Sequence, residues 1–490
     1  SLSSWRWQPL VSGCAAWRHV SQRVPPTVTA LPGFRKKRMN RQDIDTLVAW
    51  CTEKQITEVE CMIPDLAGVA RGKILPVRKF LDGLTRDSHH LPESIFIQTI
   101  TGEYPDLEDE VVPVIDRDVV LHPDPATIRM VPWYQEPTAQ IICDCYYPDG
   151  QAVAIYTREV LRRVVALYHQ RGWSPIVAPE LEFYLVDINR DPNTPLKTPI
   201  GRNGRPETAR QSYGIDAVNE FDPVFEDVYD FCEAQAIDID TLNHESGAAQ
   251  IEINFMHGAP LELADQAFLF KRTVRQTAFR HDIYATFMAS PMQHEPGSSM
   301  HIHQSILNDR DGSNLFSDSA GAPSKQFRHY LGGLQKYLPA AMIMFAPNVN
   351  SYRRMLYGEA PINIHWGKDN RSCGLRVPND IAENRRVENR IGGADVNPYL
   401  AIAGTLLCGY LGMVEELEPA PEQTGNAYVL PRGLPLYLPD ALTAFSDSAA
   451  MRSVFGDALV TALSESKWVE FRTYNAVISS WEREHLLLNV

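Results

Sequence analysis

The stretch Gly297-Ser-Ser-Met-His-Ile-His-Gln-Ser305 decides the fold prediction, because polar and apolar side chains alternate along it. Side chains of a β-strand point to opposite faces in turn, so residues two apart share a face. His301, His303 and Ser305 therefore lie on one face of a strand predicted over residues 300–306, with methionine and isoleucine on the other. The sequence thus places two imidazoles side by side over an apolar back.

Three further predicted strands have the same pattern. Glu180 and Glu182 share a face of residues 176–186, over leucine and phenylalanine. The segment 250–255 carries Gln250, Glu252 and Asn254 on one face. The segment 386–391 carries Arg386, Glu388 and Arg390 on one face. An ordinary amphipathic strand with its polar side in water would explain any one of these. Solvent faces usually mix Lys, Thr and Ser, however, so four strands carrying Glu, His and Arg favour a shared polar cavity.

The residue types in this cavity suit phosphoryl transfer. Carboxylates that face one another repel and take up protons unless a cation neutralises them. Glutamate and histidine without clustered cysteine suit Mg²⁺ or Mn²⁺ rather than structural zinc, and more than three carboxylates suggest two ions. Arginines beside them suit an anionic substrate, because guanidinium binds carboxylate or phosphate bidentately. Metal-bound carboxylates with arginines are the groups that phosphoryl transfer needs.

Composition and missing motifs narrow the classes of function. The formal charge of −15, from 46 basic and 61 acidic residues, disfavours binding to nucleic acid or to an anionic membrane. No apolar run approaches the roughly 20 residues of a membrane span. Eight scattered cysteines without a CxxC pair predict a reducing, cytoplasmic compartment. Neither GxxxxGK[ST] nor GxGxxG occurs, which argues against a P-loop or Rossmann nucleotide site.

The chain divides into three parts by pattern. Residues 1–38 contain no Asp or Glu and end in a basic run before Met39. They form either a targeting peptide or an extension ahead of a start at Met39, and we favour the extension because prolines interrupt any amphipathic helix. Residues 39–150 are rich in strand patterns and end in the turn Tyr147-Pro-Asp-Gly150, whereas residues 151–490 alternate strands with helices. Helices are predicted over 157–171, 325–345 and 397–415.

From about Met39 to Val490 the chain resembles glutamine synthetase. Seven pieces carry the resemblance, in the family's order: Pro179-Glu-Leu-Glu-Phe183, His244-Glu245 with Gln250-Ile-Glu252, the opening stretch, Asn350-Ser-Tyr-Arg-Arg354, Asn370-Arg-Ser372, Arg386-Val-Glu-Asn-Arg390 and Asn397-Pro-Tyr-Leu400. One piece alone would be a weak signal, but the ordered set is specific.

The resemblance implies an α+β fold, with a small N-terminal β-grasp domain over 39–150 and a large catalytic domain over 151–490, built on a curved antiparallel sheet. It implies a homo-dodecamer of two hexameric rings with active sites between subunits. It also implies a ligase whose substrates are ATP, glutamate and an amine, with two or more Mg²⁺ or Mn²⁺ ions per site. ATP would phosphorylate the γ-carboxylate of glutamate, and the amine would then displace the phosphate.

Residue roles follow from the matched motifs as expectations. One metal would be held by Glu182, Glu245 and Glu252, and the other by Glu180, His301 and Glu388. Substrate glutamate would lie against Gly297, Arg354 and Arg390. ATP would lie among Asp240, His303, Ser305, Arg376 and Arg386. Arg371 would stabilise the transferring phosphate, Glu359 would help to deprotonate the amine, and Asp65 would enter the amine pocket of a neighbouring subunit.

Four departures from glutamine synthetase concern the amine. Pro296 replaces the usual asparagine, the segment between Arg354 and Glu359 is one residue short, the segment around Tyr213 lacks Gly-Gly-Tyr-Phe, and the end at 479–485 is distinctive. These segments resemble the γ-glutamylpolyamine synthetase branch, which acts in polyamine breakdown. Tyr213 is therefore assigned to substrate binding, and the predicted product is a γ-glutamyl amide of putrescine or a related amine.

Alternatives remain open at this stage. Ordinary glutamine synthetase, using ammonia, is the first, and a non-catalytic homologue that retains the fold is the second. The acidic segment Glu103, Tyr104, Asp106 and Glu108 is either a wall for a diamine's far ammonium or a solvated loop, and we favour the loop. Tyr428 lies where some bacterial relatives carry a regulatory tyrosine, but its flanking acidic residues are missing, which favours a packed loop tyrosine.

Overall fold

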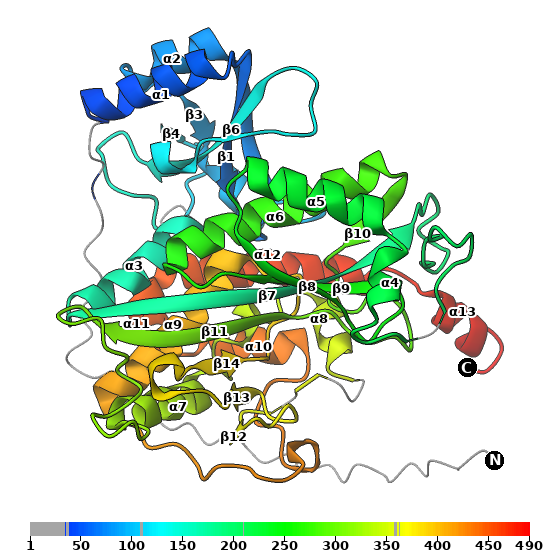
Figure 1. Cartoon of the computed structure of the whole chain (residues 1–490). Coiled ribbons are helices and arrows are strands. Elements are labelled where there is room, and N and C mark those ends of the chain that lie inside the picture. The colour runs from blue at the N-terminus through cyan, green and yellow to red at the C-terminus, as the bar shows by residue number, and fades with distance from the viewer. Residues whose placement is uncertain (1–34, 36–38, 108–110, 209, 357–359, 362) are drawn as a thin grey trace.

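The computed structural model describes residues 35, 39–107, 111–208, 210–356, 360–361 and 363–490 (Figure 1). Of the segment 1–38, only Arg35 is among the described residues, so the structure does not test what this segment is. Glu359, predicted to help deprotonate the amine, also lies outside the described residues. The described chain forms two sheets, one of six and one of eight strands.

The six-stranded sheet has the order β2-β1-β6-β4-β3, with β5 paired to β6. The β1–β6 pair is parallel and the other pairs are antiparallel. In Figure 1 it lies at the top of the molecule together with two helices. Its elements are α1 (Arg41–Glu53), β1 (Glu58–Pro64), β2 (Ala70–Pro76), α2 (Val77–Leu84), β3 (His90–Pro92), η1 (Glu93–Phe96), β4 (Asp118–Pro123), η2 (Pro125–Thr127), β5 (Arg129–Met130) and β6 (Thr138–Tyr146).

The eight-stranded sheet has the order β12-β13-β14-β11-β7-β9-β8, with β10 paired to β7. Every pair is antiparallel except β12–β13. Figure 1 shows β7 and β11 side by side across the middle of the molecule. Its strands are β7 (Trp173–Asp187), β8 (Ile239–His244), β9 (Gln250–Phe255), β10 (Ile283–Thr286), β11 (Met300–Asn308), β12 (Trp366–Lys368), β13 (Leu375–Val377) and β14 (Val387–Asn389).

Helices pack around this second sheet. The sequence predicts one helix over 325–345, but α7 ends at Tyr337 and a separate short helix, η3, follows. Pro339 explains the break, because proline cannot donate a helical hydrogen bond and clashes with the preceding turn. The helices are α3 (Thr157–His169), α4 (Ile215–Asn219), α5 (Asp222–Ala234), α6 (Pro260–Arg280), α7 (Lys325–Tyr337), η3 (Met342–Met344), α8 (Val349–Arg354), η4 (Ala382–Asn384), α9 (Pro398–Glu415), η5 (Ala427–Val429), α10 (Leu438–Ser446), α11 (Ala449–Phe455), α12 (Asp457–Asn475) and α13 (Ser480–Leu486).

Helix α9 lies in the core. It begins where the sequence predicts, because the Asn397 side chain accepts a hydrogen bond from the Tyr399 N–H and caps the first turn. By length and composition alone α9 could span a membrane, but 89% of it is buried inside the structure, as expected of a core helix. A Cβ on Gly333 of α7 would lie 2.3 Å from the Cys408 carbonyl oxygen, so glycine allows α7 and α9 to approach closely.

A buried arginine joins the first sheet to the helices of the second. The Arg158 side chain is 2% exposed and binds Asp124 and Asp144 of the first sheet's region, at 2.7 and 2.6 Å. It also binds Asp265 of α6 at 2.8 Å. The six-stranded sheet ends at Tyr146 and α3 begins at Thr157, so the boundary predicted near residue 150 lies in the connection. The division into domains stays a prediction.

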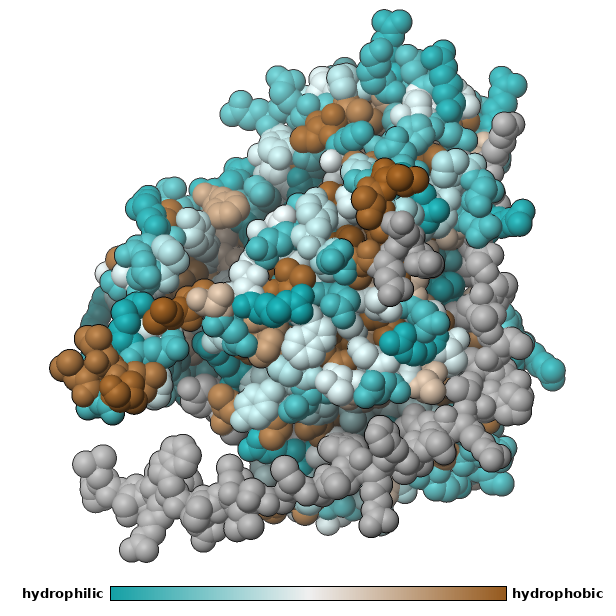
Figure 2. All heavy atoms as spheres, turned by 180° about the vertical axis from the view of Figure 1, so that it is seen from behind, coloured by the Kyte–Doolittle hydropathy of each residue, from teal (hydrophilic) through white to brown (hydrophobic). Residues whose placement is uncertain are grey.

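Apolar side chains are exposed at the C-terminal end of the chain. Figure 2, which views the molecule from behind, shows hydrophobic residues gathered at the end where Figure 1 places the C-terminus. The large exposed apolar residues from position 477 onward are Val477, Ile478, Trp481, Leu486, Leu487, Leu488 and Val490. Exposed apolar patches are a common feature of surfaces that contact another molecule.

Candidate active site

Strand register brings the predicted metal ligands together. On adjacent strands β7 and β9, Glu182 lies opposite Glu252. On β11, His301 lies opposite Glu180 of β7, and His303 lies opposite Glu388 of β14. Residues opposite one another in a sheet share a face, so the carboxylates and imidazoles of four strands line one surface.

Three groups of side chains have ligand atoms within 4.8 Å of one another. The first group, Glu182, Glu245 and Glu252, contains the three residues predicted for one metal. Of the three predicted for the other metal, Glu180 and His301 group with Glu252, while Glu180 and Glu388 group with His303. His303, which the resemblance assigns to ATP, therefore also lies at a metal position. Oxygen-rich sites of this composition fit hard divalent cations.

The protonation of these carboxylates supports a cation here. Burial, and then the charge of Glu245, raise the pKa of Glu182 to about 8. Burial and four neighbouring glutamates, Glu180 first, raise the pKa of Glu252 to about 10. Such groups hold protons at neutral pH unless a cation replaces the protons, so the donor set fits a metal centre.

Neighbouring histidines and arginines lower the pKa of the other two carboxylates, those of Glu180 and Glu388. Burial alone would raise the pKa of Glu180, but hydrogen bonds with His301 and His303 hold it well below its usual value. Glu180 Oε2 lies 3.2 Å from His301 Nδ1, and Oε1 lies 2.8 Å from His303 Nε2. For Glu388, burial would raise the pKa, but the charges of Arg390, His303 and His301 together lower it to about 2. Glu180 and Glu388 are therefore ionised at neutral pH even without a bound cation, whereas Glu182 and Glu252 are protonated.

Replacing Glu252 by glutamine should stabilise the metal-free protein above neutral pH. The folded pKa of about 10 exceeds the ordinary value of 4.5, so the folded state binds more protons between these values and stability falls as pH rises through that window. Glutamine is neutral without taking up a proton on folding, so we expect a gain on the order of 1 kcal/mol at pH 8, read as a higher Tm in chelator. Mn²⁺ should then raise the Tm less than in the parent.

Exposed Glu262 of α6 provides the control for this variant, since Glu262→Gln should leave both the chelator Tm and the Mn²⁺ response unchanged. An unaltered Mn²⁺ response in Glu252→Gln would contradict the metal assignment.

Two arginines converge on Glu388, which is 1% exposed. Arg376 Nη1 donates to Glu388 Oε2 at 2.7 Å, and Arg390 Nη1 donates to Oε1 at 2.5 Å. The Nε atoms of both arginines are buried without a hydrogen-bond partner. The carboxylate thus fixes both guanidinium groups while leaving donors available to an anion.

Arg354 is held against the backbone beside Gly297. Its Nη2 donates to the carbonyl oxygens of Arg390, Ile391 and Gly392 at 3.2, 2.6 and 3.0 Å. Its Nε and Nη1 are buried and have no partner. A Cβ at Gly297 would lie 2.2 Å from Arg354 Cγ and 2.6 Å from the Ala289 carbonyl oxygen, so only glycine fits there. Two unpaired buried donors next to an unobstructed backbone suit a carboxylate.

The residues predicted to surround ATP are only partly brought together. Arg386 Nε lies 3.2 Å from His303 Nδ1, and Arg386 Nη1 pairs with Asp380 at 2.6 Å. Ser305 shares the face of His303 on β11. Asp240 is exposed on β8, and three strands separate β8 from β14 in the sheet. The structure therefore groups Arg386, His303 and Ser305, but not Asp240.

Two predicted residues stand at the rim of the cluster. Tyr213 is 69% exposed and adopts φ = 59°, and burial followed by the charges of Glu245 and Glu252 raises the pKa of its hydroxyl. Its electrostatic coupling to those glutamates puts it near the first metal group. Arg371 is exposed, and it also acts electrostatically on Tyr213.

Asp65 is engaged elsewhere in its own chain. It is fully buried, and its carboxylate accepts hydrogen bonds from Arg71 Nε and the Val69 N–H, both at 2.8 Å. Its carbonyl oxygen accepts from the Asn397 side chain at 2.9 Å. A contribution to a neighbouring subunit's site stays a prediction. Glu103, considered above as part of an amine wall, accepts from Thr473 of α12 at 2.8 Å.

Gln250 has a larger part in the site than its sequence position suggests. Its Nε2 lies 3.3 Å from Glu182 Oε2 and donates to the Gly297 carbonyl oxygen at 3.1 Å, while the Ser299 N–H donates to Glu182 at 2.7 Å. Gln250 thereby connects a predicted metal ligand to the predicted substrate-binding glycine. The alternating pattern of β9 did place it on the polar face, but nothing in the sequence indicated these partners.

Comparisons with known proteins agree with this geometry. The family "Glutamine synthetase, catalytic domain" matches residues 154–486. Gamma-glutamylputrescine synthetase PuuA of Escherichia coli (strain K12) is 35% identical over 448 residues, which cover 88% of this chain and 92% of that protein. Glutamate–isopropylamine ligase of Pseudomonas sp is 31% identical over 456 residues, covering 90% and 97%. The solved structure of GmaS without ligand has a TM-score of 0.77 at 26% identity, covering 90% of this chain and 99% of that one, and the GmaS/ADP complex gives 0.76.

The fold, the site and the relatives together define an ATP-dependent carbon–nitrogen ligase. The chain belongs to the glutamine synthetase family. This confirms the predicted family, the α+β fold with its curved sheets, and an activity that forms γ-glutamyl amides. Use of ATP and a divalent metal follows from the family. The three groups of glutamate and histidine side chains described above can hold such an ion.

Proposed function

We propose that this protein joins glutamate to an organic primary amine of the putrescine type, through a γ-glutamyl phosphate formed from ATP. The observation that carries the proposal is the glutamate–histidine–arginine cluster on four adjacent strands, in a chain whose relatives include ligases named for putrescine and isopropylamine. Pro296 supports an organic amine rather than ammonia, because proline has no side-chain amide where ammonia-using relatives are expected to carry asparagine. The Pro296 carbonyl accepts from the Tyr184 hydroxyl at 2.8 Å, which anchors this segment to β7.

The roles of the side chains follow the chemistry of the two steps. The three groups of glutamate and histidine side chains would hold two Mg²⁺ or Mn²⁺ ions, and these would supply positive charge that neutralises phosphate oxygens. Arg354 and Arg390 bind the substrate glutamate, with the Gly297 backbone beside it. Arg371 stabilises charge on the transferring phosphoryl group. Arg376 and Arg386, with His303 and Ser305, surround ATP; the nucleotide in the GmaS/ADP complex supports such a site.

The amine must lose a proton before it attacks the acyl phosphate. A primary ammonium has a pKa near ~10.4 by analogy with lysine, so a nearby carboxylate must accept the proton. Glu359 and a neighbouring subunit's Asp65 are the proposed bases, and Tyr213 is proposed to contact the amine. The carboxylates of Glu245 and Glu252 act electrostatically on Tyr213, which supports a position of its ring beside the proposed metal site.

Phosphate release from ATP with Mg²⁺ and glutamate tests the function across ammonium, putrescine, spermidine, ethanolamine and small monoamines. We expect a much higher kcat/KM for one organic amine than for ammonium, and a γ-glutamyl amide of that amine in mass spectra of the product. Reactions without glutamate control for idle ATP hydrolysis. Turnover with ammonium alone would instead identify a glutamine synthetase with unusual loops.

The proposed assembly is a homo-dodecamer of two six-membered rings in the cytoplasm, with sites between subunits. The exposed apolar side chains at positions 477–490 support an oligomer, because a monomer would leave them in water. Light scattering should give a mass near twelve times the 55.2 kDa of one chain. A monomeric mass at micromolar concentration would rule this assembly out.

A further inference from the structure

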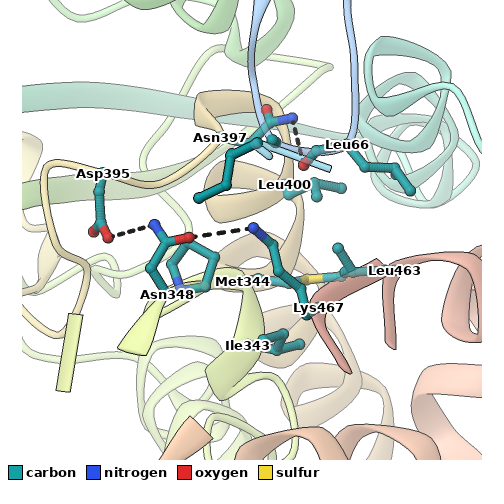
Figure 3. A pocket seen from close by; sticks show the side chains of 12 residues that line it. Leu66, Ile343, Met344, Asn348, Asp395, Asn397, Leu400, Leu463 and Lys467 are labelled. Carbon is teal, nitrogen blue, oxygen red and sulfur yellow. Dashed lines mark hydrogen bonds between the residues drawn. The ribbon is translucent and has the colours of Figure 1, made fainter. Parts of the chain in front are cut away.

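A buried ionic network lies where α12 meets the start of α8 (Figure 3). Lys467 Nζ on α12 lies 2.7 Å from Glu470 Oε2 and donates to Asn348 Oδ1 at 3.3 Å. The Lys467 side chain is 3% exposed and that of Glu470 is 8% exposed. Burying an ammonium is costly unless it is paired and hydrogen-bonded, so a lysine at this place indicates a specific partner.

Lys467 determines which way the Asn348 amide faces. An ammonium can only donate hydrogen bonds, so the Asn348 oxygen must point toward it. The amide nitrogen then points toward Asp395, a carboxylate that can only accept, and donates to Asp395 Oδ2 at 2.7 Å. Figure 3 shows the two bonds in line, from Lys467 through Asn348 to Asp395. A flipped amide would lose both bonds, so the two charges select one orientation.

Asp395 connects Asn348 to helix α8 and to the segment 390–395, in which Asp395 itself lies. Its Oδ2 also accepts from the Ser351 hydroxyl at 2.7 Å, and the Ser351 hydroxyl oxygen accepts from the Asn348 N–H at 2.9 Å. The first turn of α8 is thereby attached to the segment 390–395. Arg354 attaches the other end of α8 to the same segment, through its bonds to the carbonyl oxygens of residues 390–392. Helix and segment are thus joined at both ends.

We propose that Lys467 is a positioning residue for Arg354: through Asn348 and Asp395 it sets the place of α8 and of segment 390–395, and so the geometry in which Arg354 meets the substrate carboxylate. The proposal rests on the role proposed above for Arg354 in binding glutamate. Lys467 contacts none of the predicted metal ligands, so its influence falls on glutamate rather than on the metals or ATP.

The surroundings of Lys467 allow a rescue experiment. A cavity of about 120 Å³ adjoins it, lined by apolar side chains that include Ile343, Met344 and Leu463 as well as by Asn397. This space can accept the larger guanidinium of arginine, which keeps the charge and the donors. Glu470 would still be paired, and its other oxygen would still accept the Ile100 N–H at 3.0 Å.

The test compares Lys467→Met with the parent in steady-state kinetics with the best amine. We expect the KM for glutamate to rise about tenfold, while the KM for ATP and the Mn²⁺-dependent rise in Tm stay within twofold and 1 °C of the parent. Lys467→Arg should restore the KM for glutamate to within about threefold. Lys336→Met is the matched control, because Lys336 also lies 2.7 Å from a glutamate, Glu415, but is 39% exposed and takes no part in this network.

An unchanged KM for glutamate in folded Lys467→Met would overturn the proposal. So would equal losses for glutamate and ATP, or a failure of arginine to rescue, since both indicate a merely structural lysine. If Lys467→Met does not fold, Glu470→Gln tests the proposal instead. This variant keeps an acceptor for the Ile100 N–H but removes the charge that pairs with the Lys467 ammonium. It must then raise the KM for glutamate and leave the KM for ATP unchanged. If the parent forms no γ-glutamyl amide, the proposed function fails, whereas the glutamate concentration that half-maximally raises the Tm still tests Lys467 and must increase in Lys467→Met.

Discussion

Glu388→Ala should lower kcat by about 10²–10³-fold and remove one divalent cation per chain, while the chain stays folded. Glu388 holds the guanidinium groups of Arg376 and Arg390 at 2.7 and 2.5 Å and has a ligand atom within 4.8 Å of those of Glu180 and His303. The alanine variant therefore loses a carboxylate of a proposed metal position. It also leaves Arg390 without its carboxylate partner, which costs about 3–5 kcal/mol in comparable broken pairs.

Two further measurements separate these effects. Calorimetric titration with Mn²⁺ should show fewer bound ions in Glu388→Ala, and Glu388→Gln should lose the charge but keep the side-chain volume and at least one hydrogen bond. Glu418→Ala is the control, because Glu418 also pairs with an arginine, Arg328 at 3.2 Å, but is 60% exposed. Near-normal turnover with an unchanged number of Mn²⁺ ions would sink the metal assignment.

Local sequence pattern predicted the strands of the site because period-two alternation is a property of the strand itself. Segments 176–186, 250–255 and 300–306 all lie within observed strands, and their polar faces meet as expected. The segment predicted over 386–391 is shorter, since β14 covers only Val387–Asn389. Arg386 and Arg390 therefore flank the strand, and this frees their side chains to bend toward His303 and Glu388.

The supports of the site could not be predicted from local pattern, because they join residues far apart in the chain. The Arg354 guanidinium binds carbonyl oxygens 36–38 residues away, and Lys467 reaches Asn348 across 119 residues. Carbonyl oxygens have no sequence signature, and a buried lysine looks like any other lysine in an amphipathic helix. The family resemblance supplied ligands by motif, but these supports follow from packing that only the folded chain defines.

Arg371→Ala should lower kcat by about 10²–10³-fold and change the KM for ATP much less. Its neighbours hold its backbone: Asn370 donates to the carbonyl oxygens of Gln423 and Gly425 at 2.9 and 2.8 Å, and the Ser372 hydroxyl accepts from the Ala427 N–H at 2.9 Å. The guanidinium itself is exposed and forms no hydrogen bond or ion pair with the part of the chain that the structure describes.

Arg371 thus has a fixed backbone and a guanidinium that is free to bind substrate. This arrangement is expected of a residue that pairs with charge developing on the phosphoryl group in the transition state. The energy of that contact is absent from the ground state, so its loss should fall on kcat. Arg353→Ala is the matched control, because Arg353 is also exposed but binds the Tyr474 hydroxyl, at 2.5 Å, and should leave kcat within twofold. An Arg371→Ala effect confined to the KM for ATP would place Arg371 in ground-state nucleotide binding and would contradict a role in phosphoryl transfer.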